Sequence, residues 1–183
     1  MRLIAILIFI SSTSTAQNLL PSLGSWREYL PYQNARDVTA SANKIICATP
    51  YSLFTIDRTT KEIQRISKVS GLSETGISTI KYDEVSNKLF IAYTNSNMDV
   101  IAEGKTINIP DIKRSNVSGD KTIYQVVPAN DVCYLATGLG IIVIDANKYE
   151  VKESWFIGNS GGYVKTNSFV KTNGYYYAAT DEG

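Results

Sequence analysis

The chain contains no histidine, so its candidate chemical groups are carboxylates and two cysteines. Ser-His-Asp and Cys-His nucleophile systems, and zinc sites built on imidazole, are therefore excluded in their usual forms. Two dispersed cysteines cannot form a thiolate metal cage, and we predict no metal and no other cofactor. A pair of carboxylates is the remaining catalytic device, because two such groups can hydrolyse sugar polymers by acid-base chemistry.

The candidate carboxylates are Asp57 with Asp145, and Asp83 with Glu84. Asp57 and Asp145 each close an apolar run where a turn begins, and Asp83 and Glu84 lie between two apolar runs. Asp is favoured there because its side chain accepts hydrogen bonds from nearby backbone N–H groups. We therefore interpret these residues as turn residues and assign no catalytic, metal-binding or ligand-binding residue. The chain is predicted not to be an enzyme, with a carbohydrate-active enzyme as the weakest alternative.

Two glycine-rich stretches, residues 138–140 and 158–162, are candidates for phosphate binding. A phosphate-binding glycine loop opens a helix, and neither stretch precedes a helical pattern. We interpret both stretches as turns.

One strand-like motif recurs along the chain with a period of about 44 residues. Its copies contain an alanine at Ala48, Ala92, Ala136 and Ala179. Repeats of 40 to 50 residues built from strands are typical of β-propeller blades. A β-sandwich has similar short strands but no reason to repeat a motif at constant spacing, and no segment has the apolar spacing of a helix.

Each repeat is predicted to contain four antiparallel strands. First strands are expected at residues 37–40, 77–82, 123–127 and 168–171, and second strands at 44–49, 88–93, 132–137 and 175–180. Third strands are expected at 53–57, 98–101 and 141–145, and fourth strands at 63–66, 106–109 and 151–155. The predicted fold is all-β, a β-propeller of about three and a half blades truncated before ring closure. The blades span approximately residues 35–67, 77–110, 122–156 and, incomplete, 167–183.

Residues 1–16 have the order of a secretory signal peptide, with Arg2, a short apolar run and small side chains ending at Ala16. The remaining residues, 17–183, form the partial propeller and contain no apolar run of the roughly 20 residues that a membrane span needs. Their formal net charge is zero once Arg2 is removed, which argues against nucleic-acid binding. We expect an exported protein of the periplasm, the outer membrane or the cell surface.

The two cysteines are predicted to be free and buried. Cys47 and Cys133 lie on the same face of equivalent strands, with a whole blade between them. A disulfide needs Cα atoms within about 7 Å, which this arrangement does not allow.

Aromatic side chains are predicted to pack mostly between blades, although exposed ones can stack on sugars or anchor a protein partner. They include Trp26, Tyr29, Tyr32, Tyr51, Tyr93, Tyr124, Tyr134, Trp155, Phe156 and Tyr163.

Residues 24–35, 44–49 and 71–78 resemble the N-terminal β-propeller of PorZ-type proteins. That family belongs to the type IX secretion system of Bacteroidota. The resemblance implies a non-catalytic recognition or scaffold propeller of the attachment complex at the outer membrane. Its implied partners are the sortase that couples cargo to anionic lipopolysaccharide, and this glycan itself.

Residues 71–73, 77–80, Asp83 and residues 88–93 also resemble the repeat of two-component-regulator propellers, which are periplasmic sensor domains of hybrid histidine kinases. Those repeats carry Trp and Gly-Thr where this chain has Phe90 and Ala92-Tyr93. A periplasmic ligand-sensing propeller of a hybrid two-component regulator is therefore the alternative function.

Overall fold

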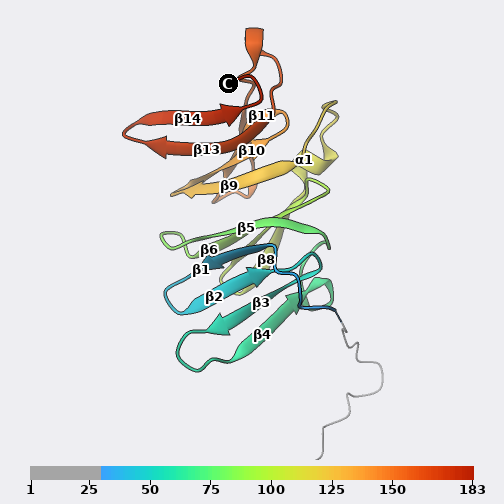
Figure 1. Cartoon of the computed structure of the whole chain (residues 1–183), viewed down its shortest axis with the longest axis vertical. Coiled ribbons are helices and arrows are strands. Elements are labelled where there is room, and N and C mark those ends of the chain that lie inside the picture. The colour runs from blue at the N-terminus through green and yellow to red at the C-terminus, as the bar shows by residue number, and fades with distance from the viewer. Residues whose placement is uncertain (1–29) are drawn as a thin grey trace, which may run out of the picture.

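The structure, a computed structural model, describes residues 30–183 as a row of four antiparallel sheets (Figure 1). The predicted signal peptide lies outside the described residues. Blade 1 comprises β1 (Asp37–Ala40), β2 (Lys44–Ala48), β3 (Ser52–Asp57) and β4 (Ile63–Ser67). Blade 2 comprises β5 (Ile77–Asp83), β6 (Lys88–Tyr93), β7 (Met98–Ala102) and β8 (Lys105–Ile109). Blade 3 comprises β9 (Ile123–Ala129), β10 (Val132–Thr137), β11 (Gly140–Asp145) and β12 (Glu150–Trp155), and blade 4 comprises β13 (Thr166–Thr172) and β14 (Tyr175–Thr180).

The repeat in the sequence corresponds to a repeat in strand register. The repeat alanine of each second strand lies opposite Asp37, Thr79, Gln125 or Ser168 in the first strand of the same blade. Each predicted strand is present, and its bounds differ from the prediction by a few residues at most. The all-β, partial β-propeller prediction is confirmed.

The first strands of neighbouring blades lie closest together, and the blades diverge toward their fourth strands. Between blades, the closest contacts join β1 to β5, β5 to β9 and β9 to β13. Short connector helices lie at the outer side, where the blades diverge: η1 (Lys68–Ser70), α1 (Asp111–Arg114) and η2 (Asn159–Gly161). Figure 1 shows α1 at the end that carries the connectors between blades, opposite the turns that join first to second strands and third to fourth strands.

Apolar side chains fill all three junctions between neighbouring blades. Ile46 and Leu53 of blade 1 pack against Ile91 of blade 2, and Phe90 of blade 2 packs in one cluster with Leu135 of blade 3. A third cluster joins blades 3 and 4. Each strand contributes alternate side chains to opposite faces, so every blade between two others is apolar on both sides.

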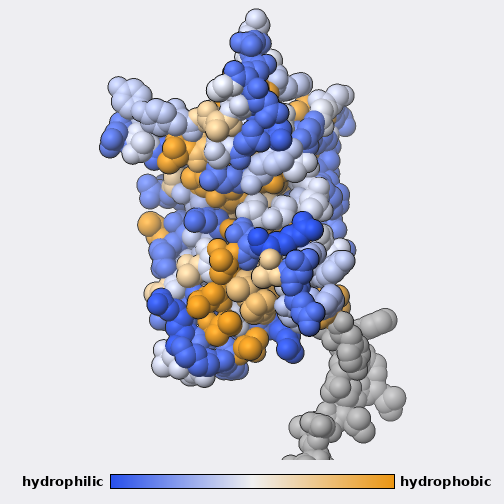
Figure 2. Space-filling model, viewed as in Figure 1, coloured by the Kyte–Doolittle hydropathy of each residue, from blue (hydrophilic) through white to orange (hydrophobic). Residues whose placement is uncertain are grey.

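The outward faces of blades 1 and 4 have no neighbouring blade in the structure. Val38 of blade 1 is 61% exposed, whereas its equivalents Ile80, Val126 and Phe169 are 2–4% exposed. Tyr175 and Tyr177 are exposed on blade 4. In Figure 2, apolar side chains accordingly gather over blade 1 on the visible face.

Both cysteines are free, as predicted, but only one is buried. Cys133 lies in the core between blades 2 and 3, and burial raises the pKa of its thiol. Cys47 is half-buried, so the prediction that both are buried was wrong. It lies opposite Val38, on the face of blade 1 that no other blade covers. Burial raises the pKa of the Cys47 thiol as well.

Both glycine-rich stretches form turns, with one addition to the prediction. Residues 159–161 form a single 3-10 turn, η2, because Gly158 and Gly162 close a loop through a backbone hydrogen bond of 3.0 Å. Gly140 starts β11 with φ +126°, and a Cβ there would lie 2.3 Å from the carbonyl oxygen of Trp155. Only glycine fits this close approach of two strands.

Candidate functional site

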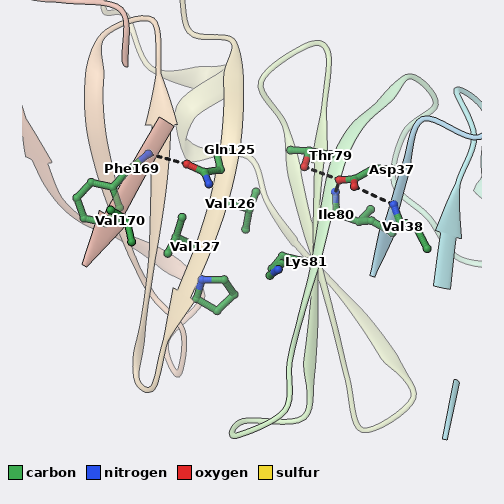
Figure 3. A pocket seen from close by; sticks show the side chains of 11 residues that line it. Asp37, Val38, Thr79, Ile80, Lys81, Gln125, Val126, Val127, Phe169 and Val170 are labelled. Atoms are coloured by element: carbon green, nitrogen blue, oxygen red, sulfur yellow. Dashed lines mark hydrogen bonds between the residues drawn. The ribbon is translucent and has the colours of Figure 1, made fainter. Parts of the chain in front are cut away.

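The first strands of all four blades line a cavity of about 400 Å³ (Figure 3). Its lining is formed by Asp37 and Val38 of β1, Thr79, Ile80 and Lys81 of β5, Gln125, Val126, Val127 and Pro128 of β9, and Phe169 and Val170 of β13. Because one side of these strands has no further strand beside it, their free edges face the cavity. The cavity therefore combines exposed backbone edges, apolar walls and a few polar side chains.

The Asp37 carboxylate joins blade 1 to blade 2. One oxygen, Oδ2, accepts hydrogen bonds from the Thr79 hydroxyl at 2.7 Å and from the Ile80 backbone N–H at 2.8 Å. The other oxygen, Oδ1, accepts from the Val38 N–H at 2.8 Å. Both carboxylate oxygens are thus engaged by the protein itself, as Figure 3 shows.

Gln125, at the equivalent position of blade 3, joins blade 3 to blade 4 in the same way. Its Oε1 accepts from the Phe169 backbone N–H at 2.6 Å. Ile80 and Phe169 are equivalent residues, so the same edge N–H is bound at both junctions. We call this contact the edge clasp: a side chain opposite the repeat alanine accepts from the first strand of the next blade.

The junction between blades 2 and 3 has no edge clasp among residues 30–183. Thr79 occupies the accepting position; its hydroxyl donates to Asp37, and no N–H of blade 3 donates to it. A second contact is lost as well. Thr39 accepts from the Tyr82 N–H at 3.1 Å across the first junction, whereas the equivalent residues here are Lys81 and Pro128. Lysine cannot accept and proline cannot donate.

Lys81 is the only basic residue of the cavity lining. It is exposed, and no hydrogen bond or ion pair of its side chain occurs in the described part of the chain. Its ammonium is therefore available to a ligand, while the cavity's carboxylate is not.

The candidate carboxylates lie at the hairpin turns, outside this cavity. Asp57 accepts from the N–H groups of Thr60 and Thr59, and these bonds lower the pKa of its carboxyl. Asp145 accepts from Lys148 and Asn147 and has a lowered pKa for the same reason.

The remaining pair behaves similarly. Asp83 accepts from Ser86 and Val85 within its own turn, and Glu84 is exposed beside it. Turn contacts were predicted for all four candidate carboxylates; they are present for Asp57, Asp83 and Asp145.

The aromatic side chains divide between packing and exposure. Tyr93 and Tyr134 are buried. Tyr134 forms a cluster with Trp155, Phe169 and Tyr176 at centroid distances of 5.1–5.7 Å. Burial, followed by its hydrogen bond with Tyr176, raises the pKa of Tyr134 to about 12.

Other aromatic residues lie outside the junctions between blades. Tyr51, Phe156 and Tyr163 are exposed at the connector end, where no blade face covers them. Tyr32 contacts Phe54 edge-on, and Tyr124 bonds Asp120 at 2.5 Å. Trp26 and Tyr29 lie outside the described residues.

A buried carboxylate was missed from the sequence. Asp99 is fully buried and accepts from the Tyr93 hydroxyl at 2.6 Å, the Ser73 N–H at 2.8 Å and the Asn108 amide at 2.8 Å. It binds Ser73, in a segment that carries part of the family resemblance, to blade 2. The sequence did carry a signal for this site, because Asp99 is a charged residue within an apolar strand and a buried charge needs hydrogen-bond partners.

Within residues 30–183, no three Cys, Asp or Glu side chains gather as metal ligands. No helix in the same range has the length and apolar character to cross a membrane.

Comparison with known proteins places the chain in a family. The profile described as "TSS9, PorZ, N-terminal beta-propeller domain" matches residues 45–183. No curated protein matches the chain in sequence.

Solved structures show the same fold. PorZ, a bacterial surface component of the type IX secretion system of Porphyromonas gingivalis, is similar with 24% identity and a TM-score of 0.69 over 76% of this chain and 18% of that one. The extracellular domain of a putative hybrid two-component system from B. thetaiotaomicron has 15% identity and a TM-score of 0.64 over 81% and 20%. Apo AztD from Citrobacter koseri has 12% identity and a TM-score of 0.56 over 79% and 41%. The chain spans about a fifth of the length of the first two structures.

Proposed function

Because this chain belongs to the PorZ N-terminal β-propeller family, we propose that it is a non-catalytic recognition and scaffold propeller of the type IX attachment complex. The family match over residues 45–183 is the observation that carries the proposal. The related surface component of P. gingivalis belongs to the same secretion system. The signal-peptide pattern of residues 1–16 supports export, and the proposed location is the outer membrane or cell surface.

The geometry supports binding rather than catalysis. Both oxygens of Asp37, the only carboxylate of the cavity, are held by neighbouring backbone and hydroxyl groups. General acid-base chemistry on a sugar needs two carboxyl groups facing the same bond. The cavity offers instead an apolar wall, a free ammonium and strand edges, which are means of recognition.

The proposed partners are a sortase-like protein of the attachment complex and the glycan of lipopolysaccharide. Tyr51, Phe156 and Tyr163 supply exposed aromatic surface at the connector end, and Phe156 and Tyr163 lie edge-to-face at 4.9 Å. Aromatic rings of this kind stack on sugars and anchor protein partners.

Crosslinking in native cells tests the proposal. The affinity-tagged protein is crosslinked, purified and analysed by mass spectrometry, and the same preparation is probed for bound lipopolysaccharide. We expect a sortase or another outer-membrane component of the secretion system, and enrichment of the glycan over a tagged exported control protein. Recovery of neither would contradict the proposal.

The alternative is a ligand-sensing ectodomain. The observation behind it is the similar fold of the solved two-component propeller. A sensor would be continuous with an apolar span of about 20 residues and a kinase region. Detection of such a kinase fused to this domain, with a transcriptional response lost on its deletion, would favour the sensor over the scaffold.

A further inference from the structure

The junction between blades 2 and 3 has hydrogen-bond donors at the cavity but lacks the acceptors of its neighbours. Its accepting position is held by Thr79, whose hydroxyl donates to Asp37, and the next accepting position is held by Lys81. At the junctions on either side, Asp37 and Gln125 accept from an edge N–H.

The backbone N–H of Val126 is the donor at this junction that no edge clasp binds. Val126 is equivalent to Ile80 and Phe169, whose N–H groups are bound by the edge clasps. Pro128, two residues further along β9, has no N–H, which is the pattern expected of positions whose N–H would point to a free strand edge. No side chain, and no backbone carbonyl of another blade, accepts from the Val126 N–H within residues 30–183.

The charged donor at the same junction is Lys81. Figure 3 shows its side chain between the ribbons of β5 and β9. The other charged group of the lining, Asp37, has its oxygens occupied by Val38, Thr79 and Ile80. An ammonium and a backbone N–H at the same junction favour a ligand with negatively charged oxygen atoms.

We propose that the inner wall between blades 2 and 3 binds an anionic group, a carboxylate or a phosphate, with the Lys81 ammonium and the Val126 N–H as its donors. Val127 and Pro128 form the apolar surface beside it, which suits the ring or chain that carries the anion. The cavity of about 400 Å³ has room for a group the size of a single sugar acid. This site does not depend on the proposed secretion partners.

Competitive labelling of lysines in the full chain tests the site directly. The chain is acetylated briefly without ligand, with D-glucuronate, with inorganic phosphate or with uncharged D-glucose, and the modified lysines are quantified by mass spectrometry. We expect glucuronate or phosphate, but not glucose, to slow acetylation of Lys81. Lys105, which is exposed on β8 and outside the cavity, serves as the reference for general reactivity.

The two anionic probes separate the sources of the same chemistry. Protection by glucuronate alone identifies a carboxylate on a sugar ring, and protection by phosphate identifies a phosphate group. Equal labelling of Lys81 under all conditions would overturn the proposal.

Variants then separate charge from structure. Calorimetric titration of the protecting anion should show affinity lowered roughly tenfold in Lys81→Gln, the scale of a charge-assisted hydrogen bond. Lys81→Arg should retain binding, and Lys105→Gln should be unchanged. Equal affinity in Lys81→Gln and the parent chain would also refute the site.

Discussion

Removal of the Asp37 edge clasp should loosen blade 1 from blade 2. In Asp37→Ala, the Thr79 hydroxyl and the Ile80 N–H lose their acceptor. Neither donor has a second protein acceptor within residues 30–183. The expected result is a loss of stability with local opening at this junction.

The magnitude follows from two hydrogen bonds to a charged acceptor. Such bonds contribute about 1.5–3 kcal/mol each, and the half-buried position of Asp37 puts them at the lower end. We therefore expect Asp37→Ala to lower the free energy of unfolding by about 3 kcal/mol. Asp37→Asn keeps an acceptor oxygen but loses the charge, and should cost about 1 kcal/mol.

Urea unfolding followed by circular dichroism measures the global effect, and hydrogen exchange of the Ile80 amide measures the local one. The matched control is Gln125→Ala, which removes a single bond from a neutral acceptor and should accelerate exchange at Phe169 rather than Ile80. If Asp37→Ala left both the stability and Ile80 exchange unchanged, the edge clasp would not hold the blades together.

Three further predictions concern the backbone, the cysteines and pH. Gly140→Ala should lower the free energy of unfolding by at least about 3 kcal/mol, because its Cβ meets the Trp155 carbonyl. Gly104→Ala, with φ +74° and nothing within 4 Å, should cost only about 1 kcal/mol, and equal melting temperatures would refute this contrast. In the denatured, unreduced chain both cysteines should react with a thiol reagent. In the folded chain the half-buried Cys47 should react far faster than the buried Cys133. Failure to detect free thiols would contradict the structure. Because burial raises the pKa of Cys133, its stabilising effect is complete below about pH 8.5 and is lost as pH rises toward the native pKa. Above about pH 9, this group should lower the free energy of unfolding by about 1.4 kcal/mol per pH unit. Denaturant titrations under reducing conditions should show that Cys133→Val removes this pH dependence. An unchanged dependence in the variant would exclude the thiol as its source.

The strands were predictable because the same physical requirement recurs in each blade. A small residue is needed opposite the first strand where blades pack, and the alanines at positions 48, 92, 136 and 179 mark it. Turn residues such as Asp57 also carry their own local signal, since their partners lie two or three residues away.

The candidate site was not predictable in the same way, because its contacts cross between blades. Asp37 reaches Ile80, a separation of 43 residues, and its role depends on the register of two blades at once. The repeat did carry a usable signal, since Asp37, Thr79, Gln125 and Ser168 occupy one position and only two of them form the edge clasp.

The wrong predictions of side-chain burial also have a common cause. Cys47 and Val38 have the residue types of a covered face, and their exposure depends on which blades lie beside them rather than on their own strands. The exposed Tyr51, Phe156 and Tyr163 lie at the connector end, outside the alternation that assigns strand residues to blade faces.

Deletion of the coding sequence in the native organism tests the proposed function most directly. The measurement is the fraction of type IX cargo attached to the cell surface, compared with cargo in the medium, by quantitative proteomics of both fractions. A component of the attachment complex predicts loss of surface-attached cargo, restored when the gene is returned. Unchanged attachment of cargo in the deletion strain would contradict a role of this propeller in the secretion system.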